Sequence, residues 1–140
     1  MYEYAMALVI EQREKEGIQI IDLKGRLTVG PEVASFREKI SAEIERGANQ
    51  LILNLADVDY IDSTGLGSLV ICFTRMQKSG GAMKLLDLNR RNIELLVLTK
   101  LTTVFELFNT EQDAVNSFFP DREIKKFDIL SFVQSQNEGQ

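Results

Sequence analysis

The sequence predicts an α/β fold: a mixed β-sheet of about five strands with about four α-helices, followed by a C-terminal extension. Strand-like apolar runs alternate with segments whose apolar residues recur at the period of a helix, as expected where helices join parallel strands. Residues 51–55 are apolar on both faces apart from Asn54, which is typical of a strand buried within a sheet. Two further strand candidates near the N-terminus predict an antiparallel part of the same sheet.

The first predicted elements are a hairpin and a helix. Ala5–Glu11 and Ile18–Leu23 are strand candidates, and the short segment Lys15–Gly17 between them predicts an antiparallel hairpin. A helix should begin at Pro31, because the N–H group that proline lacks would be unpaired at the first helical position. This helix should end at Gly47. Its predicted apolar stripe consists of Val33, Phe36, Ile40 and Ile44.

The remaining elements follow from the same patterns. The strand at 51–55 is expected at the centre of the sheet, and the helix after it should begin near Ser63 and end at Gly80 and Gly81. The other predicted elements are a strand at Met83–Leu88, a helix from Asn89 or Arg90, a short strand at Val104–Phe108 and a last helix that Thr110 and Asp113 cap.

The stretch Tyr60–Leu69 lies where the central strand ends and the next helix begins. In open α/β folds, sites are usually built at this edge, beyond the carboxyl ends of the parallel strands. Asp62, Ser63 and Thr64 are all N-cap residue types, although one helix needs only one N-cap. Gly65 and Gly67 each cost roughly 1 kcal/mol relative to alanine in a helix, a loss that close approach of another chain or a ligand would justify.

These residues allow two interpretations. In the first, Asp62 or Ser63 simply caps the helix, and the glycines let the helix pack closely on the sheet. In the second, Ser63 is an exposed hydroxyl that a partner enzyme phosphorylates. A phosphate there would add about −1.5 to −2 charge at a helix N-terminus, whose backbone N–H groups and dipole accommodate an anion.

The stretch Tyr60–Gly67, after Leu51–Leu55 and before Gly80 and Gly81, resembles the signature of the STAS domain, and most closely that of bacterial anti-sigma factor antagonists. The resemblance extends from about Met6 to Phe119 and includes Gly25–Leu27, Asn54 with Leu55, Leu85 with Leu86, and Asn92 with Ile93.

The resemblance implies a function and a site. In that family the partner anti-sigma factor is a serine kinase, which phosphorylates the serine of the Asp–Ser pair; by position this serine is Ser63. The unphosphorylated form binds the kinase and releases its sigma factor, and a phosphatase resets Ser63. The implied partner-binding residues are Asp62, Ser63, Thr64, Gly65, Leu66 and Gly67, with further surface from Gly25–Val29 and from a loop around Asp57–Asp59.

Composition excludes several classes of function. No apolar run among the 140 residues approaches the roughly 20 that a membrane span requires. The net charge of −5, without a stripe of Lys and Arg, disfavours nucleic acid and anionic membrane surfaces as partners. With no His and a single Cys, Cys72, the chain lacks the usual metal ligands and the commonest general base. We therefore expect no metal, no cofactor, a buried structural thiol at Cys72 and a protein as partner.

The N-terminus has no basic segment of the kind that begins a secretion signal, so we expect a cytoplasmic protein. Residues 1–120 form the predicted STAS domain, and residues 121–140 form an extension beyond Pro120. This extension is too apolar for a fully solvated tail, so we expect it to pack partly, on its own domain, on a second copy in a homodimer or on a dedicated partner, with Gln134–Gln140 frayed. Its apolar residues are Ile124, Phe127, Ile129, Leu130, Phe132 and Val133.

The sequence therefore favours an anti-sigma factor antagonist that phosphorylation of Ser63 switches, with Thr64 as the second candidate acceptor. Asp62 either orients the Ser63 hydroxyl or only caps the helix. The alternatives are a STAS module of a larger signalling scaffold or transporter-associated complex, and an enzyme or small-ligand sensor at the same edge. Enzymatic activity is disfavoured, because the chain has no phosphate-binding loop, no hydrolase elbow and no histidine to activate Ser63.

Overall fold

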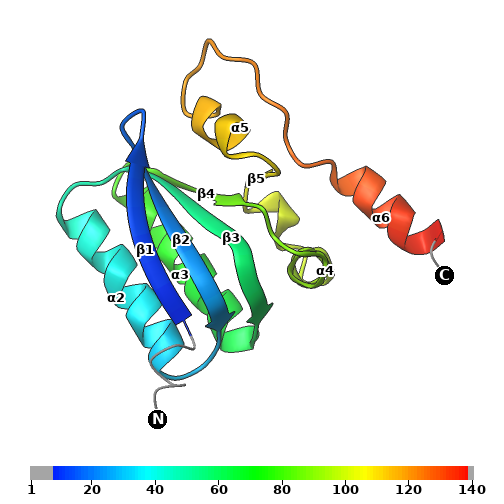
Figure 1. Ribbon diagram of the computed structural model, residues 1–140, viewed down its shortest axis with the longest axis horizontal. Helices are drawn as coiled ribbons and strands as arrows, with labels where there is room; N and C mark the ends of the chain where they lie inside the picture. Colours follow the sequence, from blue (N-terminus) through cyan, green and yellow to red (C-terminus); the bar gives the residue numbers. More distant parts are fainter. Residues whose placement is uncertain (1–7, 139–140) are drawn as a thin grey trace.

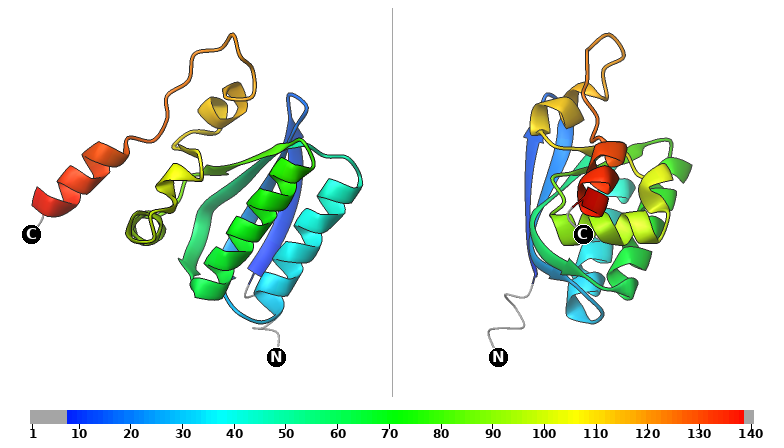
Figure 2. Two further views of the ribbon diagram at one scale, coloured as in Figure 1. Left: turned by 180° about the vertical axis from the view of Figure 1, so that it is seen from behind. Right: turned by 90° about the vertical axis from the view of Figure 1, so that its right-hand side faces the viewer.

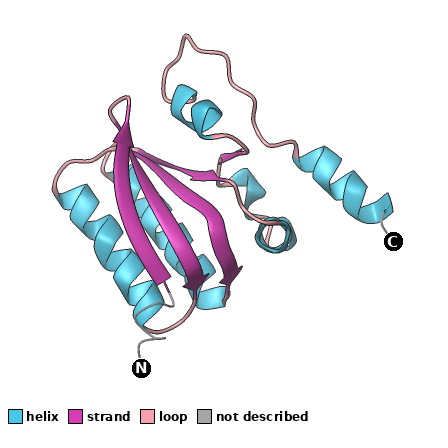
Figure 3. Ribbon diagram, viewed as in Figure 1, coloured by secondary structure: helices cyan, strands magenta, loops and turns pink. Residues whose placement is uncertain are grey.

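The computed structural model describes residues 8–138, which include a mixed sheet in the order β1-β2-β3-β4-β5 (Figures 1 and 3). β1 is antiparallel to β2, and the other neighbouring strands are parallel. The predicted mixed sheet of about five strands is therefore confirmed. The strands are Leu8–Lys15 (β1), Ile18–Leu27 (β2), Gln50–Ile61 (β3), Ala82–Leu86 (β4) and Leu107–Phe108 (β5).

The predicted N-terminal hairpin is present, with a different extent for both strands. Glu16 (φ 53°) and Gly17 (φ 85°) connect β1 to β2 in the left-handed region, which a type I′ turn requires. β1 continues to Lys15, whereas residues 5–7 of the predicted strand lie outside the described residues. β2 continues past Leu23 to Leu27. The sequence pattern ends at Leu23 because irregularities in the pairing of β2 with β3 break the alternation of apolar and polar residues beyond it.

Two layers of helices cover the sheet, as the two views in Figure 2 show. The helices α2 (Pro31–Glu45), α3 (Ser63–Lys78) and α4 (Arg90–Leu98) pack on one face, where their apolar side chains join the main core. The short helix α5 (Glu111–Asn116) covers part of the other face through Ala114 and Val115, in a smaller apolar cluster.

The central strand β3 contributes to both apolar clusters, which confirms the prediction for residues 51–55. Leu51, Leu53 and Leu55 face α2 and α3, whereas Ile52 faces the α5 side. The strand does not end there, however. It continues to Ile61, so Asp57–Asp59 belongs to β3 and is not the loop that the sequence predicts.

The chain between α4 and α5 is less regular than predicted. The strand expected at Val104–Phe108 is confined to Leu107–Phe108, because a 3₁₀ helix, η1, occupies Leu101–Thr103 and Val104 continues from it. Thr110 caps α5 as predicted, since its hydroxyl accepts a hydrogen bond from the Asp113 N–H at 3.2 Å and donates one to the Asp113 carboxylate at 2.8 Å.

The C-terminal extension contains a helix that the sequence analysis does not predict, α6 (Ile129–Glu138). Before it, the Phe127 N–H donates to the Leu107 carbonyl at 3.0 Å, and Phe127 and Ile129 pack against the main core. The rest of α6 extends away from the sheet (Figures 1 and 2), and Leu130 is 75% exposed. Residues expected to be frayed from Gln134 onward are therefore helical as far as Glu138. The domain boundary at Pro120 stays a prediction.

The helices between residues 8 and 138 are all too short or too polar to cross a membrane.

Candidate functional site

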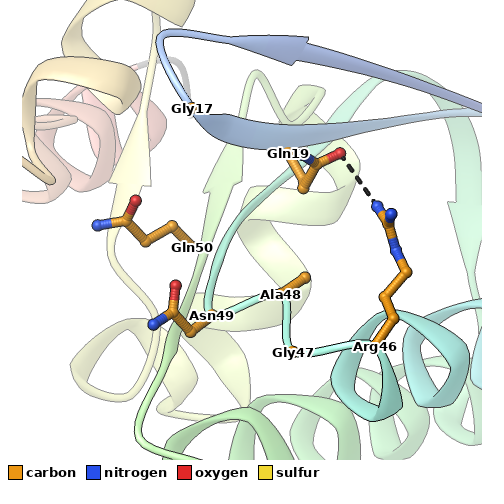
Figure 4. Close-up of a pocket in the computed structure, with 7 residues that line it drawn as sticks. All are labelled: Gly17, Gln19, Arg46, Gly47, Ala48, Asn49 and Gln50. Carbon is orange, nitrogen blue, oxygen red and sulfur yellow. Dashed lines mark hydrogen bonds between the residues drawn. The ribbon is translucent and has the colours of Figure 1, made fainter.

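The carboxyl ends of β2 and β3 and the first turns of α2 and α3 meet at one edge of the sheet (Figure 1). A pocket of about 230 Å³ lies at the opposite end of the sheet, and Gly17 and Arg46 are among the residues that line it (Figure 4). Its one charged lining residue, Arg46, is already paired with Glu43 at 2.7 Å. Sites in open α/β folds are built at the carboxyl edge of the strands, so the edge that carries Ser63 is the candidate site.

Asp62 has a structural role at this edge. It is the N-cap of α3, and its Oδ1 accepts a hydrogen bond from the Gly65 N–H at 2.7 Å. Its Oδ2 accepts a second hydrogen bond, from the Val29 N–H at 2.9 Å, in the loop between β2 and α2. Both carboxylate oxygens are therefore occupied by backbone donors, which favours capping over orientation of the Ser63 hydroxyl.

Ser63 and Thr64 differ from Asp62, because both are exposed on the first turn of α3. Within the described part of the chain, neither hydroxyl makes a side-chain hydrogen bond. Ser68, the next hydroxyl of the helix, is buried, and its Oγ donates to the Gly65 carbonyl at 2.6 Å. The structure thus leaves Ser63 and Thr64 available and commits Ser68 to the helix.

The two glycines of the motif have different surroundings. A Cβ atom on Gly65 would lie 2.0 Å from the Leu27 carbonyl oxygen, so Gly65 is required for α3 to pack against β2. A Cβ atom on Gly67 would meet nothing within 4 Å, and Gly67 has no left-handed φ. Packing inside the chain therefore explains Gly65 and leaves Gly67 without an internal reason.

Leu66, one of the partner-binding residues that the resemblance implies, contributes little exposed surface. It is only 8% exposed, because it faces the main core beside Leu69 and Ile61. In the segment Gly25–Val29, Leu27 is buried as well, whereas Val29 is exposed. The surface around Ser63 is therefore formed by Thr64, Gly67 and Val29 more than by Leu66.

A pocket of about 350 Å³ lies between the start of α3 and α4, and we refer to it as the Ser63 pocket. Ser63 and Leu66 line it from α3, and Arg91, Leu95 and Leu98 line it from α4. The other lining residues are Tyr60, Ile61, Asp62, Asn92, Glu94 and Thr99.

Two side chains at the rim of this pocket are exposed although they are large. Leu98 is 81% exposed, and Tyr60 is 42% exposed. The Arg91 guanidinium lies over the Tyr60 ring, with its carbon 5.7 Å from the ring centroid, within the range of a cation–π contact.

α4 is fixed to the end of β3 by two asparagines that the sequence analysis does not single out as part of the site. Asn89 caps α4, and its amide donates to the carbonyls of Val58 at 3.1 Å and Asp59 at 3.2 Å. The buried Asn92 amide donates to the same Val58 carbonyl at 2.9 Å. Two asparagines three residues apart at a predicted helix start are the sequence signal for this anchor.

The chemistry available at this edge is that of hydroxyl groups. Among residues 8–138, no group of three or more His, Cys, Asp or Glu side chains is arranged to hold a metal ion. Cys72 is buried, as predicted, and burial raises the pKa of its thiol to about 11, so it is an unreactive thiol.

Residues 9–114 match the family model described as the STAS domain. The anti-sigma-B factor antagonist of Bacillus subtilis is 33% identical over 73% of this chain and 92% of that protein. The anti-sigma F factor antagonist of Paenibacillus polymyxa is 26% identical over 79% of this chain and 94% of that protein.

Solved structures show the same fold. The anti-sigma factor antagonist SpoIIAA, a Bacillus protein, matches in its unphosphorylated form with a TM-score of 0.69 at 20% identity, over 82% of this chain and 100% of that one. A putative anti-sigma factor antagonist from Thermotoga maritima matches with a TM-score of 0.69 at 24% identity, over 77% of this chain and 92% of that one. This chain belongs to the STAS domain family, and its relatives include anti-sigma factor antagonists.

Proposed function

We propose that this protein is an anti-sigma factor antagonist whose binding to an anti-sigma factor is switched by phosphorylation of Ser63. The partner is a serine kinase, which transfers the γ-phosphoryl group of ATP to the Ser63 Oγ. ADP is released, and the hydroxyl proton passes to a base of the kinase. The unphosphorylated protein binds this kinase in the cytoplasm, and the kinase then releases the sigma factor that it held. A phosphatase removes the phosphate from Ser63 and so restores the binding form of this protein.

One observation carries the assignment of Ser63: its hydroxyl is exposed and uncommitted at the first position of α3, between residues with structural roles. Asp62 holds the helix start and the neighbouring loop, and Gly65 allows the close contact with β2. A hydroxyl placed on such a rigid support can be presented to another protein's active site in a fixed position. Thr64 is exposed too and is the second candidate.

The protein acts as a binding module in this proposal and needs no catalytic group of its own. The kinase supplies the nucleotide and the base, and this chain supplies the acceptor hydroxyl and the surface around it. The sequence similarity to two antagonists over more than nine-tenths of their length supports this role. The structure of SpoIIAA, whose fold this chain shares, has also been solved in a phosphorylated form. That structure matches this chain with a TM-score of 0.63 at 21% identity.

The phosphate should act through charge at the interface and leave the fold intact. It would lie at the N-terminus of α3, where the free N–H groups and the helix dipole favour an anion. A kinase surface that already holds nucleotide phosphates would repel a second dianion. Phosphorylation therefore should weaken the complex without unfolding either protein.

Mapping the phosphorylation site tests the acceptor. The chain is incubated with ATP and the anti-sigma factor kinase from the organism that encodes this protein. The product is then digested and analysed by mass spectrometry. We expect one phosphate, at Ser63, and none in the Ser63→Ala variant. Modification of Thr64 with Ser63 unmodified would contradict the assignment.

A further inference from the structure

We propose that Arg91 binds the phosphate of phosphorylated Ser63, so that the switch includes an intramolecular clamp between α3 and α4. This inference rests on the proposed function, because it concerns the phosphorylated state of the same serine. The inference adds Arg91 to the site. This residue lies on α4, which is separated from α3 by the strand β4.

The structure places both residues in the same pocket. Ser63 lines the Ser63 pocket from the first turn of α3, and Arg91 lines it from the first turn of α4. Arg91 already extends over Tyr60, which lies just before the start of α3. Because the Asn92 amide is bonded to the Val58 carbonyl at 2.9 Å, the first turn of α4 is held at the end of the strand that leads to Ser63.

The charges around the pocket leave Arg91 available for an anion. Arg91 is the one lining residue with a positive charge, and it forms no ion pair with a carboxylate of the described residues. Asp62, on the α3 side, has both oxygens bonded to backbone N–H groups. Glu94, on the α4 side, is paired with Arg90 at 3.7 Å. Arg26 is exposed beside Tyr60 on the neighbouring strand, but it does not line the pocket.

A phosphoserine is a suitable ligand for this arginine. The planar guanidinium offers parallel N–H donors that match two phosphate oxygens, and the N–H groups at the start of α3 offer further donors. The exposed position of both groups lets the side chains move toward each other across an open pocket.

The clamp would give phosphorylation a second effect besides the added charge. In the unphosphorylated protein, Arg91 lies on the Tyr60 ring and is exposed to a partner. In the phosphorylated protein, the guanidinium would be paired with the phosphate and would no longer be available. The surface beside Ser63 would thus lose a positive group when it gains a negative one.

The test uses full-length protein with phosphoserine inserted at position 63 during synthesis, so no kinase is needed. The second pKa of the phosphate, ordinarily about 6, is measured by ³¹P NMR titration. An adjacent arginine stabilises the dianion, so the pKa should rise by about 0.5 to 1 pH unit in the Arg91→Gln variant. Arg26→Gln is the matched control, because it removes the same charge from an exposed arginine beside Tyr60 that does not line the pocket. The phosphate of the Arg26→Gln protein should titrate within about 0.2 pH unit of the phosphate in the protein with both arginines, since an exposed charge outside the pocket is screened.

Equal phosphate pKa values in the Arg91→Gln, Arg26→Gln and unsubstituted proteins would overturn the clamp. Equal increases in both variants would overturn it too, because they would indicate only the general effect of a nearby charge. Neither result depends on the kinase, so the clamp and the proposed function fail separately: the mass-spectrometric mapping decides whether the kinase modifies Ser63, and this titration decides whether Arg91 holds the phosphate.

Discussion

The Asp62 Oδ2 atom accepts a hydrogen bond from the Val29 N–H at 2.9 Å, which fixes the loop between β2 and α2 against the start of α3. Its other oxygen caps α3 through the Gly65 N–H at 2.7 Å. One carboxylate therefore joins the two backbone segments that border Ser63. The position of the Ser63 hydroxyl depends on this side chain even though the two side chains do not bond to each other.

Asp62→Ala should lower the free energy of unfolding by about 1.5–3 kcal/mol, because it removes an N-cap and a second hydrogen bond to the backbone. Asp59→Ala is the control, because the Asp59 side chain is exposed and makes no hydrogen bond or ion pair in the described structure; it should change stability by no more than about 0.5 kcal/mol. Urea denaturation followed by circular dichroism measures both. A stable Asp62→Ala protein would show that the capping bonds contribute little.

The two motif glycines should respond to alanine in opposite directions. Gly65→Ala places a Cβ atom against the Leu27 carbonyl oxygen and should destabilise the protein by about 3 kcal/mol or more. Gly67→Ala fills open space in a helix and should stabilise it by about 0.5–1 kcal/mol.

The partner gives Gly67 its purpose in this account. Gly67→Ala should therefore weaken binding to the anti-sigma factor even though the protein is more stable. Thermal denaturation and titration calorimetry on the same sample measure the two effects. If Gly67→Ala binds as tightly as the unsubstituted protein, no partner approaches the helix closely at this residue.

Glu43 should make stability depend on acid pH. Its carboxylate is 3% exposed and is bonded to Arg46 and Gln12. Burial alone would raise the pKa of this carboxyl, but the hydrogen bonds from Arg46 and Gln12 and the charges of Arg46 and Lys39 outweigh it and lower the pKa. The stabilising contribution is therefore complete above the unfolded-state pKa, near 4.5, and is lost as the pH falls through the lower folded-state value.

Glu43→Gln should accordingly cost about 1–3 kcal/mol at pH 7 and much less at pH 3, as measured by urea denaturation at each pH. Glu45→Gln, at an exposed position of the same helix, is the control and should cost little at either pH. A constant difference between Glu43→Gln and the unsubstituted protein across this range would contradict the assignment.

Two truncations separate the roles of the C-terminal extension. Ending the chain after Pro120 removes the Phe127 contacts with β5 and the core, so it should lower the melting temperature. Ending it after Asp128 keeps the Phe127 contacts and removes only α6, of which Ile129 reaches the core, so it should lower the melting temperature of a monomer by less than the first truncation does. If α6 joins two copies, this second truncation should halve the mass in solution, as measured by light scattering. If neither truncation changes the mass or the melting temperature, the extension packs on nothing.

The sequence predicts best the elements whose ends carry their own signals. Pro31 and Gly47 bound α2, and Asp62 with Gly80 bounds α3, because these residues fix the backbone locally. The end of β3 could not be predicted in the same way. Asp57 and Asp59 are polar, and only the pairing with β2 beyond the bulges keeps them in the strand.

The candidate site divides along the same line. Ser63 and its neighbours are continuous in sequence, so the motif identifies them. Arg91 and Tyr60 are distant in sequence, and only the anchoring of α4 to the Val58 carbonyl brings them to one pocket.

The missed helix α6 had a local signal in the sequence. Asp128 accepts hydrogen bonds from the Ser131 N–H at 3.1 Å and from the Ser131 hydroxyl at 2.7 Å, and the two residues stand at capping distance before Phe132 and Val133.

The most direct test of the proposed switch is isothermal titration of the anti-sigma factor with three forms of this protein: unmodified, Ser63→Ala and phosphorylated at Ser63. Like charges facing each other across an interface cost several kcal/mol, and about 1.4 kcal/mol is a tenfold change in affinity. We expect Ser63→Ala to bind as the unmodified protein does and the phosphorylated form to bind roughly 100-fold more weakly or worse. Circular dichroism should show all three forms equally folded. Equal affinity of the phosphorylated and Ser63→Ala forms would contradict the switch.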